Sequence, residues 1–169
     1  LDLPRLRDNP TRFFGISDNT HLHLALSEAG IVSYYGCQFV PGIACDTSVA
    51  GFTEEYLTRA LFEEAVGTID AADKFTDEPF DRDINPDRTW EPAPGWSWEW
   101  NGGSVTGTVW GGCGIVIEHM LALDAVSVPP HSGPIVLAIE TSGLLPQAYY
   151  PKAVIRCLGE RGLLESVQA

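Results

Sequence analysis

The chain has 169 residues, of which 44% are hydrophobic, and this size and composition suit one globular domain or parts of two. It holds 23 acidic against 10 basic residues, for a net charge of −13. A surface this negative repels nucleic acid and anionic membranes, so neither is expected as a partner. The acid excess, with Lys74 and Lys152 as the only lysines, fits either a protein adapted to high salt or an ordinary acidic cytosolic protein.

The cysteines show no Cys-x-x-Cys spacing; they are Cys37, Cys45, Cys113 and Cys157. This pattern predicts neither a zinc site nor a secreted disulfide framework, and reduced thiols in a cytoplasmic protein are expected. No apolar run approaches the roughly 20 residues of a membrane-spanning helix. The sequence begins at Leu1 without an initiator methionine and reads like an internal piece of a longer chain.

Residues 4–10 predict a helical turn or loop, and the segment after them, 13–20, has the strongest functional pattern. Its sequence Phe-Phe-Gly-Ile-Ser-Asp-Asn-Thr predicts a buried strand, a sharp turn with Ser17 at its apex and the start of a helix. Such a turn can expose a serine as a nucleophile beside the N–H groups of a helix N-terminus. The pattern Gly-x-Ser-Asp is weak on its own, and Ser17 as a plain helix N-cap is the structural alternative.

The elements around Ser17 predict a parallel α/β sheet. A strand over 12–15, a helix over 18–29 and a second strand over 31–34 form a β-turn-α-β sequence, with the site at the carboxyl end of a strand. His21 and His23 lie on the same helix at positions that direct them away from Ser17, so neither is expected to be a catalytic base.

The middle of the chain is predicted to be a helix followed by a solvated connection. Thr53 is expected to cap a helix over 54–65, with acidic residues in its first turn. Residues 66–94 are rich in aspartate and proline and lack periodicity. They also lack the spacing of a calcium-binding loop, so a solvated connection is favoured over a metal site.

Three tryptophans alternate in the next segment: Trp96, Trp98 and Trp100. On a strand they share one face, and the Asn-Gly pair at 101–102 predicts a hairpin to a second strand over 104–110. The packed face of a hairpin is favoured over an aromatic platform for a sugar or a base.

Two segments in the last third predict the edges of a site. Gly111, Gly112 and Cys113 precede a buried helix over 115–123, where glycines permit close backbone approach. Cys113 as a nucleophile is disfavoured because no histidine motif accompanies it. Residues 135–139 are an unbroken apolar run that predicts a strand buried on both faces, and Glu140 follows it, either as a catalytic acid or as a strand-end acid that caps a turn.

Two further predictions complete this part of the chain. His131, in a proline-rich loop, is expected to be a surface residue rather than a base. The last helix is predicted over 148–161, ending at Gly162.

Four of these segments, 13–20, 29–36, 107–113 and 135–142, occur in the order in which they stand in the LD-carboxypeptidase family of serine peptidases. In that order the chain resembles this family, and the Glu-Thr-Ser at 140–142 and the long segment between 36 and 110 are more similar to its microcin C immunity branch. The resemblance implies an α/β fold. Residues 1–45 would be the end of a nucleophile-elbow domain, residues 46–94 an interdomain segment, and residues 95–169 the first part of a mixed α/β C-terminal domain.

The resemblance also implies roles for individual residues. Ser17 would be the nucleophile, Glu140 the triad acid, and the backbone N–H of Asp18 half of the oxyanion hole. The triad histidine would lie well downstream of Glu140, beyond residue 169, so the chain by itself is not expected to turn over substrate. Trp90, Gly112 and Cys113 are tentative substrate contacts, although the family commonly has asparagine where Cys113 stands.

The implied substrate is a small peptide or a peptidyl-nucleotide-like amide with a free carboxylate beside the cleaved bond. No cofactor and no metal are expected, and a homodimer is expected because members of the family tend to form one. Two alternatives belong to other classes. One is a catalytically inactive ligand-binding protein of the same fold, and the other is an unrelated α/β esterase.

Overall fold

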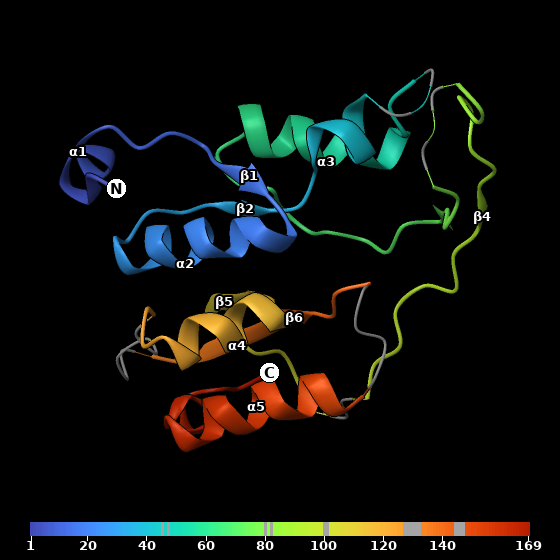
Figure 1. Ribbon diagram of the computed structural model, residues 1–169. Helices are drawn as coiled ribbons and strands as arrows, with labels where there is room; N and C mark the ends of the chain where they lie inside the picture. Colours follow the sequence, from blue (N-terminus) through green and yellow to red (C-terminus); the bar gives the residue numbers. More distant parts are fainter. Residues whose placement is uncertain are drawn as a thin grey trace. The chain divides into compact units, whose positions relative to one another are not determined.

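The computed structural model describes residues 1–44, 46, 48–79, 81, 83–99, 102–126, 133–143 and 148–169 (Figure 1). The chain divides into two compact units: Leu1–Tyr35 with Gly103–Ala169, and Gly36–Gly102. The elements of the first unit are α1 (Leu3–Asp8), β1 (Phe14–Gly15), a 3-10 turn (Ser17–Asn19), α2 (Thr20–Glu28), β2 (Tyr34–Tyr35), β5 (Thr108–Cys113), α4 (Gly114–Ala122), β6 (Ile135–Glu140), α5 (Tyr149–Glu160) and a 3-10 turn (Leu163–Glu165). The second unit contains a π-helical turn (Phe39–Ile43), α3 (Gly51–Phe62), β3 (Lys74–Phe75) and β4 (Glu91–Pro92).

The strands of the first unit form two parallel pairs. β1 pairs with β2, with Gly15 opposite Tyr35, and β5 pairs with β6 over six residues that end with Cys113 opposite Glu140. Each pair is joined through a helix that follows its first strand, α2 or α4, as parallel connections require. The α/β class with parallel strands, expected from the sequence, is confirmed.

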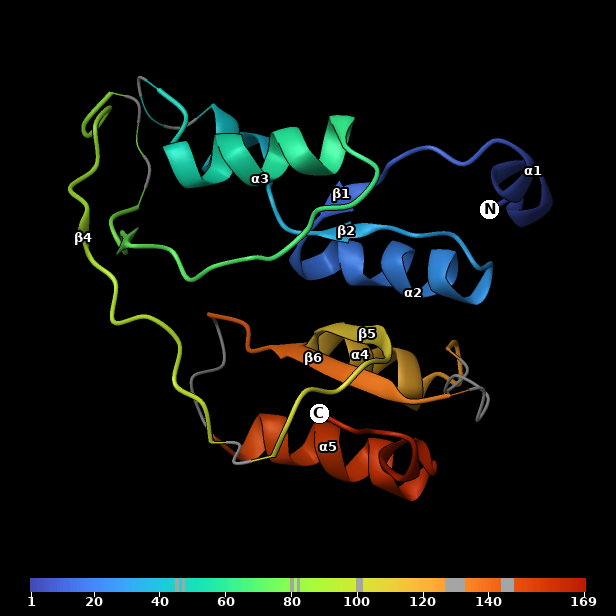
Figure 2. The ribbon, with the colours of Figure 1, turned by 180° about the vertical axis from the view of Figure 1, so that it is seen from behind.

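The main core of the first unit lies among α2, α4, α5 and the β5–β6 pair. Leu24, Ile117, Val154 and Leu158 are each at most 2% exposed and belong to one cluster. Figures 1 and 2 show α4 and α5 side by side, as their contacts also indicate. α5 ends where the sequence predicts, since Gly162 has the left-handed backbone (φ 80°) that terminates helices.

The second unit differs from the prediction at both ends of its helix. α3 begins at Gly51 with Ala50 as its N-cap, so Thr53 lies inside the helix rather than capping it. The helix ends at Phe62 because Glu63 takes an extended backbone. The Arg59 side chain then donates to the carbonyls of Val66 and Thr68, which folds the following chain back on the last turn.

The predicted tryptophan hairpin is wrong in its described parts. Trp96 and Trp98 lie outside any strand, are 52% and 74% exposed, and pack against each other edge to face. Trp100 and the turn residue Asn101 lie outside the described residues. A strand needs a partner for its backbone groups, and β5 finds its partner in β6 instead of in the tryptophan segment.

The prediction that residues 135–139 are buried on both faces is also wrong. Within β6 Ile135 is buried, whereas Ala138 and Glu140 are exposed. One side of β6 pairs with β5. On its other side, the described part of the chain joins only its first residues, where residues 166–169 run along Ile135 and Leu137. His131 lies outside the described residues.

Replacement of a core residue of α5 tests this packing. Leu158→Ala is expected to lower the free energy of unfolding by about 2–5 kcal/mol, because Leu158 is fully buried and its removal leaves a cavity. Ile155→Ala on the same helix is the matched control, since Ile155 is 45% exposed and its loss is expected to change stability by less than about 1 kcal/mol. Urea denaturation measures both, and equal losses would contradict the packing of α5.

Candidate active site

Ser17 has the backbone of a nucleophile turn. It lies between β1 and α2 and its φ is +54°, in the left-handed region that a non-glycine residue enters at a cost of about 1–2 kcal/mol. The turn is so tight that a Cβ on Gly15 would lie 2.6 Å from the Cβ of Asn19. A strand, a sharp turn and a helix therefore follow one another as the sequence predicts.

Backbone and side-chain hydrogen bonds hold this turn. The N–H of Asn19 donates to the carbonyl of Ile16 at 3.0 Å, and its side-chain amide donates to the same oxygen at 3.3 Å. The N-cap of α2 is Asn19, and Ser17 stands in the 3-10 turn before the helix. The alternative interpretation of Ser17 as the helix N-cap is therefore wrong. Asp18 is exposed beside it.

His23 lies buried behind the elbow. Its Nε2 lies 3.0 Å from the carbonyl oxygen of Gly15, so that nitrogen carries the proton, and its Nδ1 accepts from the Ser33 hydroxyl at 2.7 Å. Burial lowers the pKa of His23, and the bond to Gly15 opposes this in part. The neutral imidazole therefore fastens β1 to the segment before β2. His21 is exposed and contacts the carbonyl of Asp18 at 2.8 Å.

Glu140 is connected to the elbow through Tyr35. The Ser17 N–H donates to the Tyr35 hydroxyl at 2.8 Å, and this hydroxyl donates to Oε2 of Glu140. Tyr35 and Glu140 lie at the carboxyl ends of β2 and β6, and ligands bind at this edge in open α/β sheets. The structure thus brings together Ser17 and Glu140, the two residues expected to be catalytic.

Tyr35 is the site residue that the sequence analysis missed. Its position could have indicated a role in the site, because Tyr35 is the last residue of the strand that pairs in parallel with the strand before Ser17. Burial raises the pKa of Tyr35 to about 12, and the hydrogen bond to Glu140 adds to the rise. The phenol therefore keeps its proton near neutral pH.

Gly112 and Cys113 lie against the first turn of α2. The Cys113 N–H donates to Oγ1 of Thr20 at 3.0 Å, and a Cβ on Gly112, whose φ is +138°, would lie 2.7 Å from the Thr20 side chain. The Cys113 thiol is 1% exposed and free. This close backbone approach places the end of β5 beside the elbow.

Trp90 belongs to the second unit. Its ring is 38% exposed and faces the guanidinium of Arg88 at 5.7 Å. Arg88 also forms an ion pair with Asp46 at 2.9 Å, with both side chains about nine-tenths buried. One face of the Trp90 ring is therefore occupied within its own unit.

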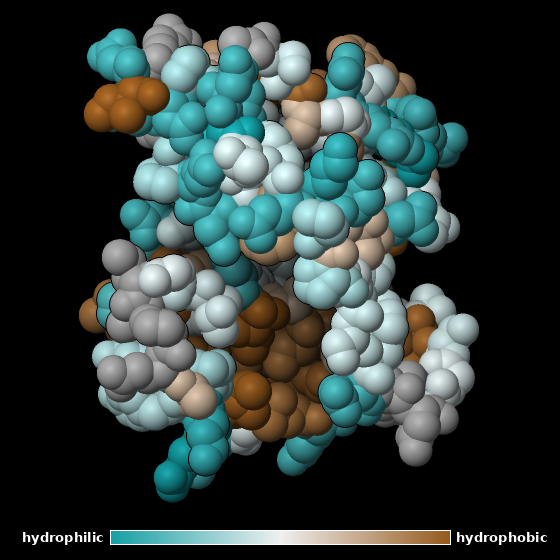
Figure 3. All heavy atoms as spheres, turned by 90° about the vertical axis from the view of Figure 1, so that its right-hand side faces the viewer, coloured by the Kyte–Doolittle hydropathy of each residue, from teal (hydrophilic) through white to brown (hydrophobic). Residues whose placement is uncertain are grey.

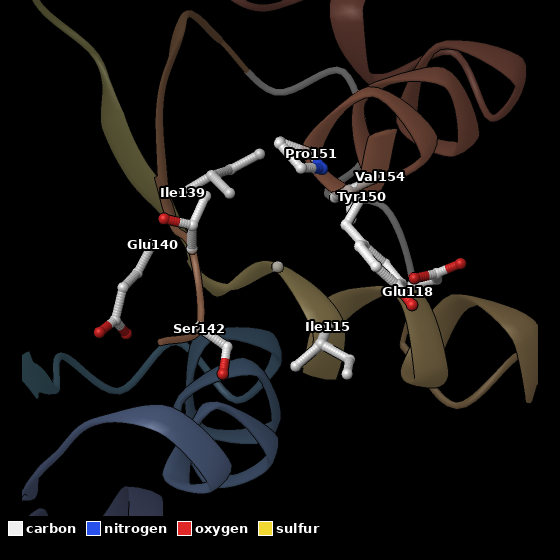
Figure 4. A pocket seen from close by; sticks show the side chains of 10 residues that line it. Ile115, Glu118, Ile139, Glu140, Ser142, Tyr150, Pro151 and Val154 are labelled. Carbon is white, nitrogen blue, oxygen red and sulfur yellow. The ribbon is translucent and has the colours of Figure 1, made fainter. Parts of the chain in front are cut away.

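A mostly apolar hollow lies beside the end of β6. Figure 3 shows hydrophobic atoms lining a hollow on the face where β6 ends and α5 begins. Ile115, Ile139 and Val154 form apolar walls, and Glu118 and Tyr150 add polar groups. Glu140 also lines this hollow. Its carboxylate turns away from Tyr150 and Pro151 (Figure 4) and accepts from the Tyr35 hydroxyl.

Two features are absent from the ranges that the structure describes. No helix in them is long and apolar enough to cross a membrane. No group of three histidine, cysteine, aspartate or glutamate side chains in them could hold a metal ion.

A serine at a left-handed turn between a parallel strand and a helix defines a nucleophile-elbow α/β protein. Residues 1–36 match the sequence model described as the LD-carboxypeptidase N-terminal domain. Over these 36 residues the match confirms the resemblance to the LD-carboxypeptidase family that the sequence suggested. A search of curated protein sequences finds no match.

Solved structures share the fold. An MccF-like protein from Streptococcus pneumoniae in complex with AMP has a TM-score of 0.80 and 20% identity, over 99% of this chain and 56% of its own. MccF in complex with glutamyl sulfamoyl guanosine has a TM-score of 0.79 and 20% identity, over 100% of this chain and 50% of its own. A muramoyltetrapeptide carboxypeptidase from Oxalobacter formigenes has a TM-score of 0.66 and 21% identity, over 99% of this chain and 47% of its own. The chain spans about half the length of these structures.

The buried imidazole gives the fold a pH dependence. Because the pKa of His23 is lowered in the folded state, the unfolded chain binds a proton first as the pH falls. Its contribution to stability is present above about pH 6.5 and is lost as the pH falls from there toward the folded pKa. His23→Gln, which can still donate to Gly15, is expected to flatten the pH dependence of the free energy of unfolding below about pH 6.5.

Denaturant titrations between pH 5 and 8 measure this slope, and His21→Gln is the control because His21 is exposed. The same slope in wild type and in His23→Gln would contradict the neutral, buried state of His23.

Proposed function

We propose that the whole protein is a serine carboxypeptidase that cleaves a peptide or peptide-like amide beside a free carboxylate. The observation that carries this proposal is the geometry of Ser17, an elbow serine whose backbone is joined to Glu140 by a single phenol hydroxyl. The family match over residues 1–36 supports the same reaction class.

The proposed chemistry is acyl transfer. Oγ of Ser17 attacks the amide carbonyl carbon while an imidazole takes the hydroxyl proton. The oxyanion that forms is bound by the backbone N–H of Asp18, the residue after the nucleophile. The imidazole then returns its proton to the leaving amine, and water hydrolyses the acyl-enzyme by the reverse sequence.

Glu140 would orient this imidazole and stabilise its charged form. The triad is completed by a histidine that the family places well downstream of Glu140. His23 is not assigned this role because both of its ring nitrogens are engaged behind the elbow. His21, on the exposed side of α2, already contacts the carbonyl of Asp18.

The proposed substrate is a small peptide or a peptidyl-nucleotide-like amide. This class is supported by two structures of the same fold, one in complex with AMP and one with glutamyl sulfamoyl guanosine. Gly112 would contribute close backbone approach beside the elbow, and Cys113 would contribute through its backbone because its thiol is buried. Trp90 would offer an aromatic face to a flat ring.

The remaining expectations concern the whole protein and stay predictions. They are a cytoplasmic location, a homodimer, and a division into an elbow domain (1–45), an interdomain segment (46–94) and the first part of a C-terminal domain (95–169).

Replacement of the nucleophile tests the function. In the complete protein, Ser17→Ala is expected to lower kcat by roughly a thousandfold or more, because nothing else supplies the acyl acceptor. The assay is hydrolysis of a glutamyl sulfamoyl nucleotide and of an L,D-linked murein tetrapeptide, followed by chromatography. Ser27→Ala, an exposed serine on α2, is the matched control and is expected to keep full activity.

Labelling separates the alternatives. A serine-directed phosphonate should modify Ser17 in wild type and leave Ser17→Ala unmodified, as peptide mass spectrometry would show. An unlabelled wild type that still binds the nucleotide would favour a ligand-binding protein of the same fold. Turnover of simple esters without preference for a free carboxylate would favour an esterase.

A further inference from the structure

We propose that Tyr35 is a positioning residue of this site: its hydroxyl ties the backbone of the nucleophile elbow to the carboxylate of Glu140. This inference rests on the proposed function for its catalytic meaning, whereas the hydrogen-bonded bridge itself does not. It adds a residue to the site that acts through Ser17 and Glu140 and takes no part in bond making.

The direction of each hydrogen bond in the bridge is fixed by chemistry. The Ser17 N–H can only donate, so the phenol oxygen accepts from it at 2.8 Å. A phenol has one proton, and in this arrangement it points to Oε2 of Glu140. The bridge therefore runs from the Ser17 amide, through one oxygen, to the carboxylate.

The phenol is held in this place by three neighbours. The backbone of Tyr35 pairs with Gly15 in the β1–β2 register. Its ring lies at 5.3 Å from the imidazole of His23, which is itself bonded to Gly15. The fully buried Thr20 side chain also acts on the phenol, where it opposes part of the rise in the pKa. A side chain with this many fixed neighbours can orient another group.

The Tyr35 hydroxyl keeps its proton and can therefore donate a hydrogen bond to Glu140 at all times. Burial and the hydrogen bond to Glu140 raise its pKa to about 12, so the phenol holds its proton throughout the range in which enzymes work. A donor that never ionises gives Glu140 the same partner at every step of a reaction.

The bridge leaves one carboxylate oxygen for catalysis. With Oε2 of Glu140 bound to Tyr35, Oε1 remains to accept the N–H of the triad imidazole. At the other end, the bond to the Ser17 N–H holds the residue whose backbone occupies the left-handed region. Loss of the phenol would free both ends, so that the acid and the nucleophile reach their reactive arrangement less often.

Removal of the hydroxyl tests the role in catalysis. In the complete protein, Tyr35→Phe is expected to lower kcat roughly tenfold, the factor of one hydrogen bond to a charged group, with KM unchanged within about twofold. Phosphonate labelling of Ser17 should slow by a similar factor. Tyr34→Phe is the matched control on the same strand, because the Tyr34 ring stacks on Phe14 and lies outside the bridge. Unchanged thermal unfolding of both variants excludes a general loss of structure.

A second experiment detects the hydrogen bond between Tyr35 and Glu140 without an activity assay. A fluorinated tyrosine placed at position 35 titrates at lower pH, and its ¹⁹F resonance reports its ionisation. Glu140→Gln is expected to lower the pKa of this residue, because the neighbouring carboxylate disfavours the phenolate. His23, the other titratable group against the ring, is neutral in this range because burial lowers its pKa. The same label at position 34 should not respond.

The outcomes distinguish the two proposals. An active wild type with an equally active Tyr35→Phe variant would overturn the positioning role and leave the proposed function standing. If the pKa of the fluorinated tyrosine at position 35 is the same in wild type and in Glu140→Gln, the hydrogen-bonded bridge itself would be overturned. A wild type that neither hydrolyses substrate nor reacts with the phosphonate, but whose label responds to Glu140→Gln, would overturn the proposed function and retain the bridge.

Discussion

The close contact between the first turn of α2 and the end of β5 is the constraint on which the site depends. Thr20 is fully buried there and accepts the N–H of Cys113, while Gly112 offers no side chain that would push α2 away. This contact joins residues 1–35 to residues 103–169. Glu140 lies opposite Cys113 in the β5–β6 register, so the same contact brings the carboxylate to the elbow. Ser17 and Glu140 are 123 positions apart in sequence and meet because of it.

The parts of the site that sequence could predict are those with local causes. Two aromatic residues, a glycine and a serine before a helical pattern specify a strand, a turn and a helix within eight residues. An apolar run followed by Glu140 specifies a strand with an acid at its carboxyl end. The parallel arrangement of the two strands on either side of α2 was predicted from the helix between them. These features need no knowledge of distant partners.

The parts that could not be predicted depend on such partners. Tyr35 is an ordinary strand residue until the pairing with β1 places its ring beside His23 and its hydroxyl beside Glu140. The alternating tryptophans fit a strand, yet β5 pairs with β6 and leaves Trp98 exposed. A periodic pattern indicates which face a strand would bury, and only the tertiary structure decides whether a partner strand is available.

Successive side chains at the end of β6 point to opposite faces of the strand, and these faces differ in polarity. The Ile139 side chain faces the apolar hollow with Ile115 and Val154, whereas the carboxylate of Glu140, the next residue, points away from Tyr150 and Pro151 and accepts from Tyr35. A shift of one residue in the β5–β6 register would exchange these faces and place the carboxylate among hydrocarbon side chains. The observed register requires a glycine at position 111, since any Cβ there would lie 1.8 Å from the carbonyl oxygen of Ala138. A glycine pair that the resemblance places at the substrate thus also allows the close strand pairing that brings Glu140 to the Tyr35 hydroxyl.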